Sequence, residues 1–357
     1  MDSTLIVAWI GFFLAAYSVV GNDVIQTLGT FLTSNEKRFP WYVLWAFAAT
    51  ILSATLIYGY LQADVAYGRL DKFEVPVELK WYYALPPLIL MFVTRLGVPV
   101  STTFMILTMF SLSDIVGSNV SEIIGAAFDF ETKLGGMIKK SVFGYLIAFS
   151  SAIVIYVTVV HLLEKIFAKT DIDIKGDKSI WTNRSFWTIA QWFSTGLLWS
   201  QWLTQDLANI YVYLGIGKQA GEPLAISGVA FVFSLLIFLG LLAFIFYSKG
   251  GAVQDIVRRK TNTSDIRSAT FVDLIYAIVL FIFKYNYLGL WEAKLPMSTT
   301  WVFIGLLAGR EIGIRLRMEG GLTKATIKDI TFDLGKVFLG LIISVALVIL
   351  IKMLETV

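Results

Sequence analysis

Two acidic residues interrupt long apolar stretches of the sequence, and each has amide side chains close by. Asp23 follows Asn22 and precedes Gln26 by three residues. A second group repeats this arrangement with Gln205, Asp206 and Asn209. Residues three or four apart share one face of a helix, so each group presents a carboxylate and two amide oxygens together. Hard cations such as Na⁺ prefer oxygen ligands. We therefore predict that Asp23 and Asp206 bind Na⁺, with the four amides as further ligands.

An ionised acid at the centre of a membrane helix costs about 2.5–3.5 kcal/mol, which a bound cation offsets. Two other interpretations stay open at this point. Asp23 could cap a second half-helix, because Asp is a favoured N-cap residue. Asp206 could be a buried acid that is hydrogen-bonded to a neighbour.

A Pro-x-Ser-Thr-Thr motif also occurs twice, at residues 99–103 and 296–300. Its hydroxyl residues are Ser101, Thr102, Thr103, Ser298, Thr299 and Thr300. Proline is favoured at the first position of a helix, where backbone N–H groups are free and the helix dipole is positive. We expect two such helix starts to face each other and to bind an anion. The alternative is that the hydroxyls bond back to carbonyls of their own helices.

The composition defines the class of protein that must position these groups. Of 357 residues, 57% are hydrophobic and 15% are charged, which excludes an ordinary soluble domain. The net charge of +3 gives no reason to expect nucleic acid as a partner. The absence of cysteine and the single histidine, His161, exclude thiolate sites and zinc motifs with two histidines.

Ten apolar segments are candidates for spanning or re-entering a bilayer. They cover residues 4–32, 41–62, 82–94, 98–116, 141–163, 185–214, 223–247, 271–291, 295–313 and 334–354. The connections 248–270 and 310–333 are rich in Lys and Arg, so the positive-inside rule places them in the cytoplasm. This predicts a multi-pass protein of the cell (plasma) membrane with both termini extracytoplasmic.

The two kinds of motif alternate along the chain, once in each half. We predict a first repeat at 1–163, a polar cytoplasmic linker at 164–184 and a second repeat at 185–357. An odd number of crossings in each half inverts the second one. The predicted fold is therefore an all-α integral membrane protein with two inverted-topology repeats of about five helical segments each and broken helices at the midplane.

At these motifs the chain resembles the inorganic phosphate transporter (PiT) family. That family carries an Asn-Asp-x-Ala-Asn type motif and a Pro-x-Ser-Thr-Thr-His type motif in each inverted half. Here Gln26 and Gln205 replace family asparagines, and Phe104 and Trp301 replace both family histidines. The resemblance implies a distant member that couples phosphate uptake to Na⁺, or to H⁺, and has extracellular termini.

The sequence thus favours a symporter of an inorganic oxyanion, most of all phosphate, rather than an enzyme. The expected partners are the oxyanion and the lipid bilayer, and Na⁺ (or H⁺) is the expected coupling ion. The sequence leaves open whether the protein forms a homodimer. Three alternatives remain: a sulfate transporter of the same fold, a non-transporting anion channel or scaffold, and an intramembrane hydrolase that uses Asp23 and Asp206 as a catalytic pair.

Overall fold

The computed structural model describes residues 3–95, 100–111, 120–160, 179–249, 266–286, 289, 291–316 and 321–355. All regular secondary structure in these ranges is helical. The first part of the chain contains α1 (Ser3–Val19), η1 (Val20–Val24), α2 (Ile25–Asn35), α3 (Trp41–Leu61), η2 (Trp81–Ala84), α4 (Leu85–Arg95), α5 (Thr102–Phe110), α6 (Val120–Phe128), α7 (Lys133–Ile155) and η4 (Tyr156–Val160). The second contains α9 (Arg184–Asp206), α10 (Ala208–Tyr211), η5 (Val212–Leu214), α11 (Gly228–Tyr247), α13 (Ile266–Tyr285), α14 (Thr299–Arg315) and α15 (Lys324–Glu355).

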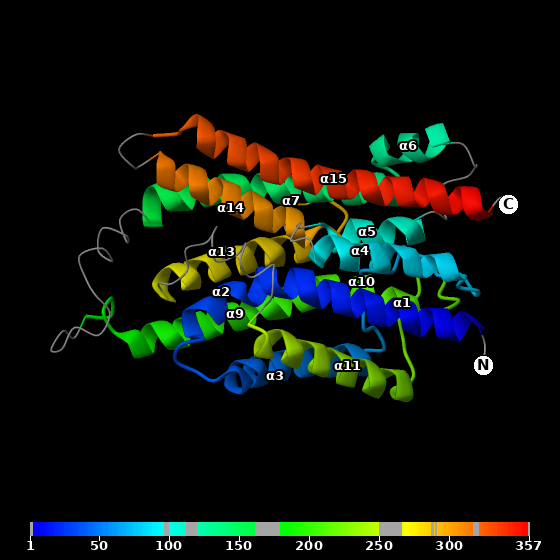
Figure 1. Ribbon diagram of the computed structural model, residues 1–357, viewed down its shortest axis with the longest axis horizontal. Helices are drawn as coiled ribbons and strands as arrows, with labels where there is room; N and C mark the ends of the chain where they lie inside the picture. Colours follow the sequence, from blue (N-terminus) through cyan, green and yellow to red (C-terminus); the bar gives the residue numbers. More distant parts are fainter. Residues whose placement is uncertain are drawn as a thin grey trace.

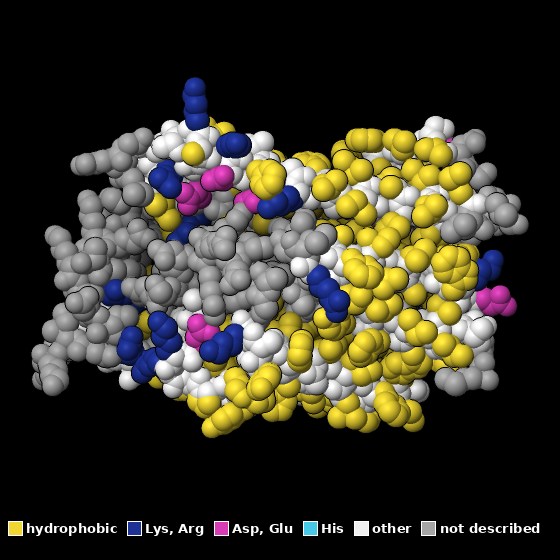
Figure 2. All heavy atoms as spheres, in the orientation of Figure 1, with side chains coloured by type: hydrophobic (Ala, Val, Ile, Leu, Met, Phe, Trp, Pro, Cys, Tyr) yellow, Lys and Arg dark blue, Asp and Glu magenta, His cyan; other side chains and the backbone are white. Residues whose placement is uncertain are grey.

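Five helical stretches in the described ranges are long and apolar enough to cross a membrane. They are Ser3–Asn35, Trp41–Leu61, Val120–Thr158, Gly228–Tyr247 and Lys324–Ile351. Many large apolar side chains on these helices are exposed, which suits a surface in contact with lipid. Apolar side chains cover much of the right-hand part of the face in Figure 2, whereas Lys and Arg gather toward its left end. The protein is therefore a multi-pass membrane protein.

Each of the ten predicted apolar segments contains helix, and their order along the chain is as expected. Two helices begin earlier than hydropathy indicates. α7 begins at Lys133 because Thr132 caps it and accepts from the N–H of Gly135, and α15 begins with a polar stretch at Lys324. The short helix α6 was not predicted. Most of the predicted linker, and His161 with it, lies outside the described residues.

Helix α14 packs closely along α7 through glycines spaced by four residues. A Cβ atom added at Gly305 would lie 2.5 Å from the carbonyl oxygen of Tyr145, and one at Gly309 would overlap the carbonyl oxygen of Phe149. Small residues let membrane helices approach to this distance. The contact fixes the position of α14, whose first residues belong to the second Ser-Thr-Thr motif.

The helices that begin with the two Ser-Thr-Thr motifs start near the middle of the molecule. In Figure 1, α5 extends from the middle toward the end where α1 begins and α15 ends, and α14 extends the opposite way. α5 also contacts α10 and α15. The starts of α5 and α14 are therefore placed close to the irregular parts of the α1–α2 and α9–α10 helices.

Candidate functional site

The first acidic motif lies in a π-helical turn. α1 and α2 form an almost continuous helix that widens at Val20–Val24, and this turn contains Asn22 and Asp23. Single π turns within α-helices are found frequently at functional sites. The interruption that the sequence predicts at this motif is therefore one wider turn between α1 and α2. Asp23 does not act as an N-cap, because no side chain caps either η1 or α2.

The second acidic motif lies where α9 ends. α9 terminates at Asp206, Leu207 forms a turn, and α10 begins at Ala208. Asn209 is in the first turn of α10, and its Nδ2 donates to Oδ1 of Asp206 at 2.8 Å. The Asp206 carboxylate at the end of α9 and the Asn209 amide in α10 therefore remain neighbours, as their spacing of three residues predicted.

The two serines of the Ser-Thr-Thr motifs are N-caps. Ser101 Oγ accepts from the N–H of Phe104 at 3.1 Å, and Ser298 Oγ accepts from the N–H of Trp301 at 3.2 Å. The expectation that proline takes the first helical position was wrong for the second motif, where Pro296 lies two residues before the cap. The serine hydroxyl binds a free N–H of the helix, so the helix starts after the serine. Pro99 lies outside the described residues.

The first Ser-Thr-Thr motif contacts both carboxylates. Thr102 Oγ1 donates to Asp23 Oδ2 at 2.5 Å, and Thr103 Oγ1 donates to Asp206 Oδ1 at 3.3 Å. Asn209 Nδ2 also lies 3.3 Å from Thr102 Oγ1 and 3.1 Å from Thr103 Oγ1. One helix start therefore joins the two acidic motifs, which are far apart in sequence.

The second Ser-Thr-Thr motif completes the cluster. Thr300 lies near the carboxylate of Asp23, and Thr299 lies near that of Asp206. Thr300 Oγ1 also donates to the carbonyl oxygen of Val100 at 3.4 Å, which accepts from Asn22 Nδ2 at 2.8 Å. All twelve predicted site residues are at most 3% exposed. The structure therefore brings the four motifs together in one buried polar cluster.

Five side-chain oxygens of this cluster are buried and have no hydrogen-bond partner. They are Asn22 Oδ1, Gln26 Oε1, Gln205 Oε1, Asp206 Oδ2 and Asn209 Oδ1. The corresponding amide nitrogens are occupied: Asn22 and Gln26 donate to Asp23 at 2.7 and 3.3 Å, and Gln205 donates to the carbonyl of Leu280 at 3.1 Å. Buried acceptors without partners are costly, so this group is suited to a bound cation.

The donor set of carboxylate and amide oxygens favours a hard cation over a transition metal. In the part of the chain that the structure describes, no group of three or more His, Cys, Asp or Glu side chains could hold a metal ion. Asp23 and Asp206 are close enough to repel each other electrostatically. A cation next to these two carboxylates reduces that repulsion.

Several contacts of the cluster come from groups that the sequence could not single out. The carbonyl oxygens of Val100 and Met297 accept from site side chains, and Tyr276 donates its hydroxyl to the carbonyl of Thr299 at 3.0 Å. Ser141 accepts from the N–H of Ser298 at 2.9 Å. Backbone groups have no residue signature, so only the three-dimensional structure identifies them.

The residues at the positions of the family histidines pack against each other. The rings of Phe104 and Trp301 meet edge to face, with centroids 5.7 Å apart. Trp301 also packs against Phe338 of α15. An apolar contact between the two Ser-Thr-Thr helices thus occupies the positions that histidines hold in the motif of the family it resembles.

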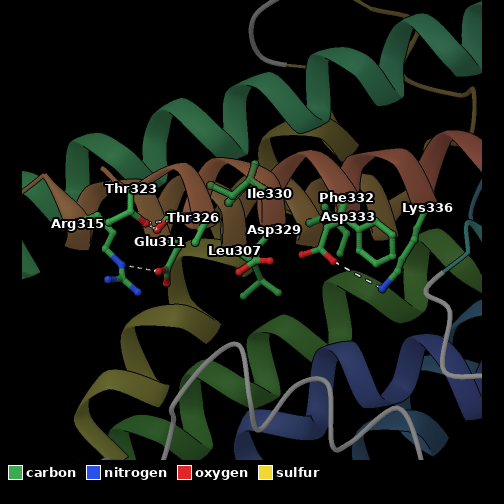
Figure 3. Close-up of a pocket in the computed structure, with 13 residues that line it drawn as sticks. Leu307, Glu311, Arg315, Thr323, Thr326, Asp329, Ile330, Phe332, Asp333 and Lys336 are labelled. Atoms are coloured by element: carbon green, nitrogen blue, oxygen red, sulfur yellow. Dashed lines mark hydrogen bonds and ion pairs between the residues drawn. The ribbon is translucent and has the colours of Figure 1, made fainter. Parts of the chain in front are cut away.

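A cavity of about 590 Å³ lies between α14 and α15. Figure 3 shows charged side chains from both helices around it, with ion pairs Arg315–Glu311 at 2.9 Å and Lys336–Asp333 at 3.9 Å. Its lining begins at Ile304, one helical turn beyond Thr300. α14 extends from Thr299 away from the end where α1 begins (Figure 1), so the lining residues along it, from Ile304 to Arg315, lie progressively farther from the polar cluster.

The helical architecture and the buried polar cluster define an all-helical, multi-pass membrane protein. The chain is similar to a solved structure described as "The sodium-dependent phosphate transporter", with 16% sequence identity and a TM-score of 0.57. The match covers 98% of this chain and 97% of that one. No protein-family model matches the chain, and no curated protein matches its sequence. The predicted resemblance is thus confirmed at the level of the fold.

Proposed function

We propose that this protein is a secondary symporter that moves an inorganic oxyanion, phosphate first, together with Na⁺. The observation that carries the proposal is the set of five unpartnered buried oxygens around Asp23 and Asp206. Coupling cations bind to these oxygens and to the carboxylates. The fold shared with a sodium-dependent phosphate transporter supports Na⁺ over H⁺, and the replacement of both family histidines by Phe104 and Trp301 agrees with it.

The oxyanion binds at the starts of α5 and α14. Both helices begin in the cluster, and the first N–H groups of each carry the positive end of the helix dipole. The hydroxyls of Thr102 and Thr103 lie beside the carboxylates, so cation and anion occupy neighbouring positions. Carrying one net negative charge into a cell costs about 2.3 kcal/mol per 100 mV, and cotransported Na⁺ removes that cost.

Two inverted repeats, 1–163 and 185–357, then move against each other, so that the site opens alternately to the two sides of the membrane. The opposite directions of α5 and α14 support the inversion. On one side of the site, the 62–80 connection and the segment before α14 are joined by the Lys72–Glu292 ion pair at 3.2 Å and by Lys294–Asp71 at 2.5 Å. The cavity between α14 and α15 lies on the other side. We infer a state closed toward the extracytoplasmic side and open toward the cytoplasm.

The same proposal places the protein in the plasma membrane, with both termini extracytoplasmic and the 164–184 linker in the cytoplasm. It assigns no catalytic step to the chain. Asp23 and Asp206 each have their own hydroxyl and amide donors rather than a shared hydrogen bond, which favours ion binding over an acid pair for hydrolysis. A homodimer is compatible with the proposal, which needs only one chain for the site.

The test is uptake of radiolabelled phosphate into proteoliposomes with and without an inward Na⁺ gradient. Uptake is expected to depend on the gradient and to saturate, and Asp23→Asn and Asp206→Asn are each expected to lower it by at least about tenfold, as expected for loss of a charged ligand. Asp129→Asn is the matched control, because this exposed carboxylate lies at the turn before α7. Gradient-independent, non-saturating flux would instead indicate a channel, and accumulation of sulfate alone would identify the other oxyanion.

A further inference from the structure

A buried guanidinium lies beside the cluster and belongs to none of its four motifs. Arg69 lies in the connection between α3 and η2, and it is 2% exposed. Its Nη1 donates to the carbonyl oxygens of Ala293 at 2.6 Å and Leu295 at 3.3 Å. Its Nη2 is buried and has no hydrogen-bond partner. Across the described ranges, no carboxylate forms an ion pair with Arg69.

Arg69 remains a cation at neutral pH. Burial lowers the pKa of its guanidinium to about 10, and the nearby carboxylate of Asp206 acts in the opposite direction. A buried charge without a counter-ion is costly, so a group with this environment requires a negatively charged partner. Asp206 lies within electrostatic range but forms no hydrogen bond with Arg69, and its Oδ2 also lacks a partner.

A second buried cation shows which part of Arg69 is available. Lys140 of α7 is 1% exposed and donates to the carbonyls of Glu292, Ala293 and Leu295 at 3.0, 3.1 and 2.7 Å. An ammonium has three donors, so Lys140 is fully used. Both cations thus hold the segment that leads into Ser298 and α14, whereas Arg69 alone retains a free terminal NH₂ group.

We propose that Arg69 is a substrate-binding residue whose Nη2 donates to the transported oxyanion. The inference rests on the proposed function and deepens it, because it defines the substrate as a species with full negative charge and oxygen acceptors. A guanidinium only donates, and its planar geometry matches tetrahedral oxyanions. The guanidinium contacts the segment that leads to Ser298 and lies within electrostatic range of the Asp206 carboxylate, so it also reduces the repulsion between that carboxylate and an incoming anion.

The alternative is that Arg69 only fastens the segment 293–295. A matched control separates the two roles. Lys218 is 6% exposed and donates to the carbonyls of Leu70, Phe73 and Gln219 at 2.7, 3.0 and 3.0 Å. It therefore fastens the same connection that carries Arg69, with all its donors used and no contact to the cluster. Lys218→Met loosens this connection and leaves the anion contact in place.

The experiment measures binding of inorganic phosphate to the purified full-length protein at saturating Na⁺, by isothermal titration calorimetry. Arg69→Gln is expected to raise the Kd about 10- to 100-fold, the range for losing a hydrogen bond to a charged group. Arg69→Lys is expected to keep part of the affinity, because the charge remains. Na⁺ binding without phosphate, measured by thermal stabilisation, is expected to persist in both variants. Lys218→Met is expected to lower thermal stability and to leave the phosphate Kd within about twofold.

An unchanged phosphate Kd in Arg69→Gln overturns the inference, and so does an equal rise in Lys218→Met. If Arg69→Gln does not fold, Arg69→Lys decides: a phosphate Kd identical to that of the unmodified protein overturns the inference, and a rise at unchanged stability supports it. If the protein binds phosphate but does not transport it, only the proposed symport is refuted, because the phosphate Kd of the Arg69 variants can still be compared with that of the unmodified protein. An unmodified protein that binds neither phosphate nor sulfate refutes both proposals.

Discussion

Thr103 donates its hydroxyl to the carboxylate of Asp206 at 3.3 Å, although 103 residues separate them in the chain. The same hydroxyl lies 3.3 Å from the carbonyl oxygen of Met297, at the start of the other Ser-Thr-Thr helix. One side chain therefore connects an acidic motif with both helix starts. Groups proposed for the cation and groups proposed for the anion are direct neighbours, so under the proposed function the binding of one ion would change the surroundings of the other through a single contact.

Removing this hydroxyl tests that connection. Thr103→Val keeps the shape of the side chain and leaves Asn209 and Asp206 without their shared partner, so we expect Na⁺-dependent phosphate uptake to fall about tenfold, in line with a lost buried hydrogen bond of roughly 1–3 kcal/mol. Thr103→Ser retains the hydroxyl and is expected to stay within about threefold of the unmodified protein. Initial uptake rates in proteoliposomes decide, and equal rates for the two variants contradict the coupling role.

The close contact between α14 and α7 gives a stability prediction. A methyl group at Gly309 would overlap the carbonyl oxygen of Phe149, so we expect Gly309→Ala to destabilise the protein by about 1–3 kcal/mol. Gly335 of α15 has no atom within 4 Å of its added Cβ, and Gly335→Ala is expected to be neutral or to stabilise by about 0.5–1 kcal/mol. Thermal unfolding in detergent measures both, and a stable Gly309→Ala variant would show that the helices can move apart.

The residue types of the cluster were predictable because they repeat and follow helical spacing. Asp23, Asp206 and their amides form one site that local sequence already grouped into two halves. That the two halves lie together was inferred from the inverted symmetry. The hydrogen bonds from Thr102 to Asp23 and from Thr103 to Asp206 join them in the structure. Arg69 escaped prediction, because nothing in a loop sequence shows that its guanidinium becomes buried beside another segment far along the chain.

Asp273 is a second residue that hydropathy did not single out. It is fully buried on α13, and it accepts hydrogen bonds of 2.5 Å from Thr30 of α2 and from Thr195 of α9. Its sequence neighbourhood contains no repeated motif, so its partners could be known only from the packing of three helices. This carboxylate holds α2, α9 and α13 together, and its hydrogen bonds are to residues outside the four motifs.

We therefore expect substitutions of Asp273 to affect stability. Asp273→Asn still accepts from one threonine and donates to the other, so the free energy of unfolding is expected to change by less than about 1 kcal/mol. Asp273→Leu leaves both hydroxyls without their partner and is expected to cost about 1–3 kcal/mol for each. Thermal unfolding of the two variants gives the comparison. A large loss in Asp273→Asn would mean that the negative charge itself is required.

Trp301 offers a test of the aromatic contact that replaces the family histidines. Its indole Nε1 is buried without a partner, and its ring meets Phe104. Trp301→Phe keeps an aromatic contact and removes the unpartnered donor, so we expect stability to change by less than about 1 kcal/mol. Trp301→Ala is expected to cost about 3–5 kcal/mol. Weakened phosphate binding in Trp301→Phe at unchanged stability would instead assign the indole N–H to the anion.

The membrane orientation can be read with single cysteines, because the chain contains none of its own. Val77 in the connection after α3 is 75% exposed, and Leu322 in the connection before α15 is 41% exposed. The Lys- and Arg-rich 310–333 connection should face the cytoplasm. We expect a membrane-impermeant maleimide added to intact cells to label Val77→Cys and to spare Leu322→Cys, which reacts only after permeabilisation. The reverse pattern would invert the topology, and it would turn the cavity between α14 and α15 from a cytoplasmic opening into an extracytoplasmic one.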